Sequence, residues 1–353
     1  MGKNRKAELS VMSVILCLMV IFIHVSSDPI VRLMTFSWQH IAVFIPWQLS
    51  SVAVFGFLFL SGLKLFLPGV SSFSPGKFYR RRFFKIVIPY ILWVVIYELW
   101  YVHPDYYPFD WGEFFLSLIS GDVTSHLYFI VILIQFYALM PLWVKIVPNV
   151  RPLPLILGSV VLSVFFFLKM PWLLSLFGIE DFVYNDRLFT TYLCFWIAGC
   201  CAGLYYEKFK AFLRRWKMPL TIAFFLAAAG DAVFYYFITI KAFYFYGCGL
   251  LHFVYCFAAI SFLFLISLGL SSRKAVSSPW FSRLDRASFA IYLSHYLILN
   301  IVDIRIAAQG IWAIDVAYAL RFLLTYILSV GGCMLYIFLK EKAGDLLLSK
   351  TKK

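Results

Sequence analysis

Long apolar segments alternate with short charged connections along almost the whole chain of 353 residues. A helix needs about 20 apolar residues to cross the hydrocarbon core of a bilayer, and segments of about that length recur throughout. They run approximately over Leu9–Ser27, Ile41–Phe66, Ile86–Val102, His126–Val147, Leu153–Met170, Leu188–Tyr206, Pro219–Ile238, Gly247–Leu270, Ala287–Ile304 and Ile314–Leu339. We therefore predict an all-α polytopic membrane protein of about ten transmembrane helices. It forms a single integral membrane domain over residues 1–353, with no soluble domain.

The charges between the apolar segments predict the topology. Lys and Arg concentrate in the N-terminal tail and in every second connection, whereas Asp and Glu dominate the other connections. Cytoplasmic loops of membrane proteins carry the excess of basic residues, so both termini are expected to be cytoplasmic. The net charge of +14 then reflects this topology and the attraction of basic loops to anionic lipids. We expect no nucleic-acid partner.

Composition supports the same class and indicates no metal site. Hydrophobic residues make up 63% of the chain and charged residues only 14%, far from the average for soluble proteins. The seven cysteines fall in or at the ends of predicted helices and show no metal-ligand spacing. A run of small residues, Gly199–Gly203, suits close packing of helices.

His24 is the most informative residue of the first apolar segment. An ionisable side chain within a bilayer is costly and usually faces a protein interior or an aqueous cavity. Ser13 and Cys17 precede it by eleven and seven residues, which places both within about 20° of His24 around a helix. Ser10 extends this polar seam by almost one turn. Imidazole can accept a hydroxyl proton at neutral pH or attack a thioester through its neutral nitrogen.

A basic, aromatic connection after the second apolar segment is the other candidate site. The stretch FYRRRFFKIVIPY surrounds Arg80, Arg81, Arg82 and Lys85 with aromatic residues. One interpretation is a positive anchor at the cytoplasmic interface. The other is a phosphate-binding site, because planar guanidinium groups match phosphate geometry.

Several further polar residues lie within the apolar segments. His126, His252 and His295 are each either interhelical hydrogen-bond partners or catalytic groups. Asp231 and Arg321 either form a structural pair with each other or line the path of a substrate. We expect Glu98 to orient an imidazole or to bind an acceptor hydroxyl.

Four stretches together resemble the acyltransferase type 3 family of integral membrane proteins. They are FGFLFLSGLKLF (Phe55–Phe66), FYRRRFFKIVIPYILW (Phe78–Trp93), SHLYFIVILIQFYALMP (Ser125–Pro141) and ASFAIYLSHYLIL (Ala287–Leu299). The resemblance implies an enzyme, an O-acyltransferase that moves acyl groups other than aminoacyl groups, commonly acetyl. The donor would be cytoplasmic acyl-CoA such as acetyl-CoA. The acceptor would be a hydroxyl of a cell-surface glycan, a cell-wall component or a lipid-linked molecule at the outer face of a bacterial plasma membrane.

The resemblance also implies roles for individual residues. His24 takes the place of the catalytic histidine of the family's first helix, and His126 assists it. The donor phosphates would bind to the basic connection at Arg80, Arg81, Arg82 and Lys85. Apart from the resemblance, we expect the polar residues Ser13, Cys17, Glu98, His295 and Arg321 to line a donor channel between the helices. One departure concerns the seam below His24, because Ser13 and Ser10 stand where the family usually carries Arg and Asp.

The predicted topology places His24 near the outer end of its helix and the basic connection on the cytoplasmic side. Much of the hydrocarbon thickness of about 30 Å would separate them, a distance that the pantetheine arm of CoA can bridge.

Two alternatives use the same polar residues. The first is a transporter or flippase of a small polar solute or a surface glycan intermediate, although the chain shows no internal repeat of the kind that many transporters have. The second is a non-catalytic scaffold within a polysaccharide-synthesis complex. The sequence leaves the acceptor, the acyl chain and the oligomeric state open.

Overall fold

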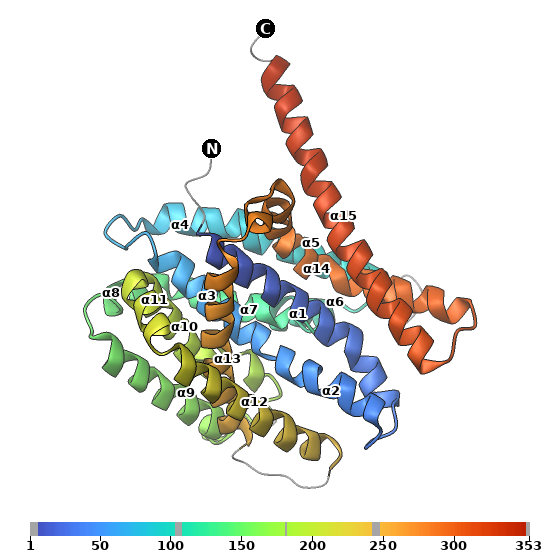
Figure 1. The fold of residues 1–353 in the computed structure, drawn as a ribbon, viewed down its shortest axis with the longest axis horizontal. Coiled ribbons are helices and arrows are strands. Elements are labelled where there is room, and N and C mark those ends of the chain that lie inside the picture. Colours follow the sequence, from blue (N-terminus) through green and yellow to red (C-terminus); the bar gives the residue numbers. More distant parts are fainter. Residues whose placement is uncertain (1–5, 103–107, 181, 242–247, 351–353) are drawn as a thin grey trace. The chain divides into compact units, whose positions relative to one another are not determined.

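The computed structural model describes residues 6–102, 108–180, 182–241 and 248–350, leaving out the side chains of residues 248 and 345–350. Within these ranges the chain forms helices and no strand, which confirms the all-α prediction (Figure 1). The helices belong to two compact units, one formed by Met1–Ala53 with Leu213–Lys353 and the other by Val54–Phe212.

The first unit holds six long helices. They are α1 (Ala7–Arg32), α2 (Trp38–Ser50), α12 (Lys217–Thr239), α13 (Cys248–Leu270), α14 (Pro279–Ala308) and α15 (Ile314–Lys350). The second unit begins within α3 and ends within α11. It holds α3 (Val52–Phe66), α4 (Pro75–Arg82), α5 (Ile88–Val102), α6 (Trp111–Ser120), α7 (Tyr128–Ala138), α8 (Met140–Ile146), α9 (Pro152–Ser175), α10 (Phe189–Leu204) and α11 (Tyr206–Arg215).

The number of membrane-spanning helices agrees with the sequence. In the described ranges, nine helices are long and apolar enough to cross a bilayer, and α7 with α8 makes a tenth if this bent pair is one span. The pair is bent by 57°, whereas the sequence predicted one continuous segment over His126–Val147. Pro141 explains the break, because proline lacks an N–H and its ring clashes with the carbonyl four residues earlier.

The start of α14 lies eight residues before the predicted segment. Pro279 occupies the first turn, and the hydroxyl of the N-cap residue Ser278 accepts the N–H of Phe281, which satisfies an otherwise unpaired helix donor. The charged residues Arg283, Asp285 and Arg286 precede the apolar stretch but already belong to the helix. Charge therefore marks where the apolar part of α14 begins, not where the helix begins.

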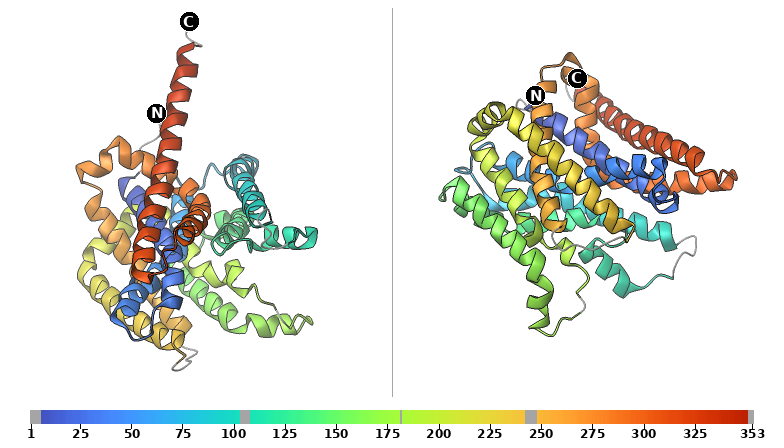
Figure 2. Two further views of the ribbon diagram at one scale, coloured as in Figure 1. Left: turned by 90° about the vertical axis from the view of Figure 1, so that its right-hand side faces the viewer. Right: turned by 60° about the horizontal axis from the view of Figure 1, so that its bottom comes forward.

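Within the first unit, α1 is surrounded by other helices. It contacts α2, α13, α14 and α15, and Met12, Leu16 and Ile21 on it are completely buried. The phenol of Tyr326 on α15 donates a hydrogen bond of 2.7 Å to the carbonyl of Leu18. The longest helix, α15, runs along α14 and continues past it toward the C terminus (Figure 2). One central helix thus carries both His24 and the core of the unit.

Within the second unit, glycines bring α3 and α10 close together. A Cβ atom at Gly199 would meet the backbone of Phe59, and one at Gly203 would meet the backbone of Leu63. Phe136 of α7 stacks on Trp196 of α10 with 4.6 Å between ring centroids. The close packing predicted for the small-residue run is therefore confirmed.

Candidate functional site

The polar seam of α1 faces α14. The Ser10 hydroxyl donates to Asp285 over 2.8 Å, and the Cys17 thiol donates to the carbonyl of Ser288 over 3.5 Å. Farther along the same side, the ring of His24 lies 5.2 Å from that of His295. Three of the predicted seam residues therefore meet one neighbouring helix, as their spacing indicated. Ser13, the fourth, is buried.

His24 lies in an aromatic and imidazole cluster at the interface of α1 and α14. Its ring is tilted against that of His295 and meets the ring of Tyr296 edge-on, with 5.3 Å between centroids. His295 is completely buried, and its Nδ1 is 3.1 Å from the carbonyl of Ile291 and 2.8 Å from that of Tyr292. Carbonyls only accept hydrogen bonds, so Nδ1 of His295 carries a proton. In the neutral ring, Nε2 is then the basic nitrogen.

Arg321 of α15 connects this cluster to two carboxylates. Its guanidinium donates to the backbone carbonyl of His24 over 3.3 Å. It also forms ion pairs of 3.4 Å with Asp28 on α1 and 3.2 Å with Asp303 on α14. One planar guanidinium thereby holds three helices together beside His24.

A cavity of about 220 Å³ opens where these ion pairs lie. Its walls come from the ends of α1, α14 and α15 and from the connection between α14 and α15, with Asp28, Arg32, Asp303, Trp312, Tyr318 and Arg321 among the lining residues. The Tyr318 hydroxyl lies 2.9 Å from the hydroxyl of Ser26. The cavity therefore carries two carboxylates and two guanidinium groups within a lining that is otherwise largely apolar, and it is built on the same helix as His24.

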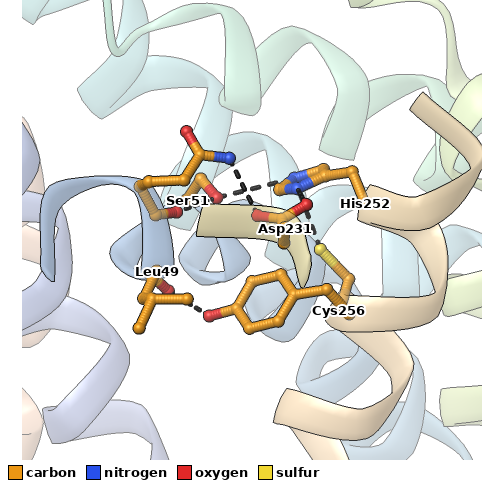
Figure 3. Close-up of polar contacts among 7 residues, drawn as sticks. Leu49, Ser51, Asp231, His252 and Cys256 are labelled. Carbon is orange, nitrogen blue, oxygen red and sulfur yellow. Dashed lines mark hydrogen bonds and ion pairs between the residues drawn. The ribbon is translucent and has the colours of Figure 1, made fainter. Parts of the chain in front are cut away.

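Asp231 belongs to a different network in the same unit, shown in Figure 3. Its carboxylate accepts the Gln48 amide over 2.9 Å and lies 2.9 Å from Nδ1 of His252. Nε2 of His252 is 3.5 Å from both the Ser51 hydroxyl and the Cys256 thiol. Asp231 is completely buried, and its partners tie α12 to α2 and α13.

This network corrects one interpretation and confirms another. The pairing of Asp231 with Arg321 is wrong, because Asp231 bonds Gln48 and His252 while Arg321 bonds Asp28 and Asp303. A single sequence does not reveal which helices are neighbours, so it could not decide between these pairings. His252 is an interhelical hydrogen-bond partner, one of the two roles considered for it.

The predicted phosphate-binding residues lie in the second unit, on α4 and on the π-helical turn Phe83–Val87 that follows it. The side chains of Arg80, Arg81 and Lys85 are exposed. Arg82 is instead turned inward, with its guanidinium carbon 4.7 Å from the centre of the Tyr137 ring and 5.2 Å from that of Phe78. Arg82 therefore packs on aromatic rings, while its three basic neighbours are accessible.

His126 and Glu98 are buried in the same unit. Nδ1 of His126 lies 3.1 Å from the Thr124 hydroxyl, and its ring meets that of Tyr97 on α5, with 5.6 Å between centroids. Glu98 follows Tyr97 directly on α5. Of the predicted site residues, the structure brings together His24, His295 and Arg321 in the first unit. His126, Glu98 and the basic connection belong to the second.

Five residues around His24 and the cavity were not predicted from the sequence: Asp28, Tyr296, Asp303, Trp312 and Tyr318. One signal was available for Asp28, which follows His24 by four residues and so lies on the same face of the helix. Asp303 is an acidic residue near the end of a predicted span that also contains His295, which is itself a functional signal. The aromatic residues carried no such signal, because aromatics make up 20% of the chain.

Comparison with known proteins agrees with the resemblance seen in the motifs. Residues 6–338 match a family model described as an acyltransferase domain, which is nearly the whole chain. No curated protein and no solved structure matches the chain.

Proposed function

The chain belongs to this acyltransferase family, and we propose that it moves an acyl group from cytoplasmic acyl-CoA to a hydroxyl acceptor at the outer face of the membrane. A cell-surface glycan is the expected acceptor, and acetyl is the expected acyl group. The observation that carries the proposal is the position of His24. Its imidazole packs against His295 and Tyr296, and Arg321, which donates to its backbone carbonyl, also lines a cavity that contains two carboxylates.

His24 acts as the general base in this proposal. Its neutral imidazole accepts the proton of the acceptor hydroxyl while that oxygen attacks the thioester carbonyl. The carbon–sulfur bond then breaks, and the proton passes from His24 to the departing CoA thiolate. A transient acyl group on His24 is the other route, with the same products. In both routes His295 and Tyr296 position the His24 ring.

The donor phosphates bind in the second unit. Arg80, Arg81 and Lys85 have exposed side chains, and charge-assisted hydrogen bonds to phosphate are about twice as strong as neutral ones. Arg82 supports this surface through its packing on Tyr137 and Phe78. His126 keeps its proposed assisting role, with Thr124 and Tyr97 holding its ring.

The test measures release of CoA from labelled acetyl-CoA by purified full-length protein supplied with a mixture of hydroxyl acceptors. His24→Gln should reduce release by at least the roughly 100-fold that general base catalysis contributes. His40→Gln is the matched control, because His40 is a buried imidazole of the same unit that packs on Phe44 and Tyr236. Equal release by wild type and His24→Gln, or no release by wild type, would refute the proposal.

A further inference from the structure

We infer that the cavity beside Arg321 is the acceptor site and that it selects a single neutral, polyhydroxylated ring over charged sugars. This inference rests on the proposed function, because it assigns the second substrate of the same reaction. Size, charge, aromatic lining and connection to His24 support it separately.

The size of the cavity matches one small ring. The cavity has a volume of about 220 Å³. Sites for drug-sized ligands begin at about 300 Å³. The cavity therefore accommodates one sugar residue, whereas an oligosaccharide would have to extend out of it.

Charge limits the chemistry of the occupant. The lining contains the carboxylates of Asp28 and Asp303 and the guanidinium groups of Arg32 and Arg321, so its formal charge is zero. Asp28 pairs with both arginines, and Asp303 pairs with Arg321. An anionic ligand would have to compete with these carboxylates for the guanidinium groups, and a cationic ligand would have to compete with the arginines for the carboxylates.

Neutral hydroxyl groups do not compete in this way. A hydroxyl can donate to a carboxylate and accept from a guanidinium at the same time, and a carboxylate oxygen offers more lone pairs than one ion pair uses. The side chains of Asp28 and Asp303 retain 45% and 35% of their exposure, so both can accept further hydrogen bonds. Neighbouring hydroxyls on one ring match this set of alternating donors and acceptors.

The aromatic residues complete the site. Trp312 is 69% exposed and lines the cavity together with Tyr318, whose hydroxyl is held at Ser26. An indole face suits the carbon–hydrogen face of a sugar ring, since aromatic side chains combine a large apolar surface with a polar edge. Arg321, which lines the cavity, also donates to the backbone carbonyl of His24, so the cavity lies beside the part of α1 that carries the proposed base.

Binding to the full-length protein in lipid nanodiscs tests the inference, because glucoside and maltoside detergents would compete. Calorimetry compares methyl glucoside with glucuronic acid and glucosamine. Methyl glucoside should bind about tenfold more tightly than either charged sugar, since a single hydrogen bond to a charged group accounts for that ratio. A parallel arm adds a glucosyl lipid to the nanodisc. It tests whether a membrane-attached sugar competes with methyl glucoside for the same site.

Variants of lining residues test the cavity. Trp312→Ala, which removes the aromatic face, and Asp303→Asn, which removes a charged acceptor, should each weaken binding of methyl glucoside by about tenfold. Trp280→Ala is the matched control, since Trp280 is equally exposed but lies at the other end of α14. Equal binding of all three sugars, or binding unaffected by Trp312→Ala and Asp303→Asn, would overturn the inference. The same holds if wild type releases CoA in a His24-dependent way but binds none of these sugars. Absence of CoA release by wild type, with binding of methyl glucoside retained, would instead count against the proposed function alone.

Discussion

Replacing Gly199 by Ala should destabilise the second unit, although Ala is the better helix former. Gly199 lies on α10, where an added Cβ would be 2.8 Å from the carbonyl carbon of Phe59 and 2.9 Å from its Cα. Carbon atoms normally approach to about 3.5–4.0 Å. The obstructing atoms are backbone atoms of α3, so no side-chain rotation can relieve the contact and the two helices must separate.

The magnitude follows from two opposing effects. Overpacking a close contact costs about 1–3 kcal/mol, and a clash with backbone belongs at the upper end of that range. Replacing Gly by Ala in a helix recovers about 1 kcal/mol. We therefore expect a net loss of about 2 kcal/mol in the free energy of unfolding.

Reversible unfolding in mixed detergent micelles measures this difference. Gly158→Ala is the control, because Gly158 is on α9 in the same unit and a Cβ there would meet nothing within 4 Å. That variant should be as stable as wild type or more stable by up to about 1 kcal/mol. If Gly199→Ala proves as stable as Gly158→Ala, the close approach of α3 and α10 does not explain the glycine.

Two further predictions concern the buried network and the basic connection. Asp231→Asn should lower the free energy of unfolding by about 1–3 kcal/mol, because an amide presents a donor to groups that now donate to the carboxylate. Asp315 is exposed, so Asp315→Asn should leave the free energy of unfolding unchanged. Equal stability of the two variants would contradict the network around Asp231. Arg82→Gln should cost about 0.5–2 kcal/mol of stability through lost cation–π packing. Arg81→Gln should instead leave stability unchanged and raise the KM for acetyl-CoA, with a smaller dependence of KM on salt than in wild type. A fall in stability for Arg81→Gln with an unchanged KM would refute this division of roles.

The local sequence was sufficient to predict which residues share one face of a single helix. The spacing of Ser10, Cys17 and His24 predicted a shared side of α1, and all three residues contact α14. Helical periodicity is a property of the backbone, so it does not depend on what the helix packs against. The small residues Gly199 and Gly203 similarly indicated a close helix contact before its partner was known.

A single sequence could not show which residues on different helices bond to each other. The opposite charges of Asp231 and Arg321 are compatible with a pair, yet the two residues bond different groups in separate networks. Asp303 and Trp312 became part of a candidate site only because α14 and the connection after it lie beside the end of α1. Arg82 could not be distinguished from Arg80 and Arg81 until its contact with Tyr137 was known.

The sequence by itself determined the class of protein, the approximate spans, the seam on α1 and the family, because apolar length, helical period and motif order are all written along the chain. Tertiary structure decided which carboxylates meet Arg321, which imidazole meets His24 and where a cavity opens. These choices depend on which helices become neighbours, and in a bilayer that is decided by close packing and interhelical hydrogen bonds among many similarly apolar surfaces. His24 is therefore recognisable from the sequence, whereas the cavity lined by Arg321, Asp28 and Asp303 exists only in the folded structure.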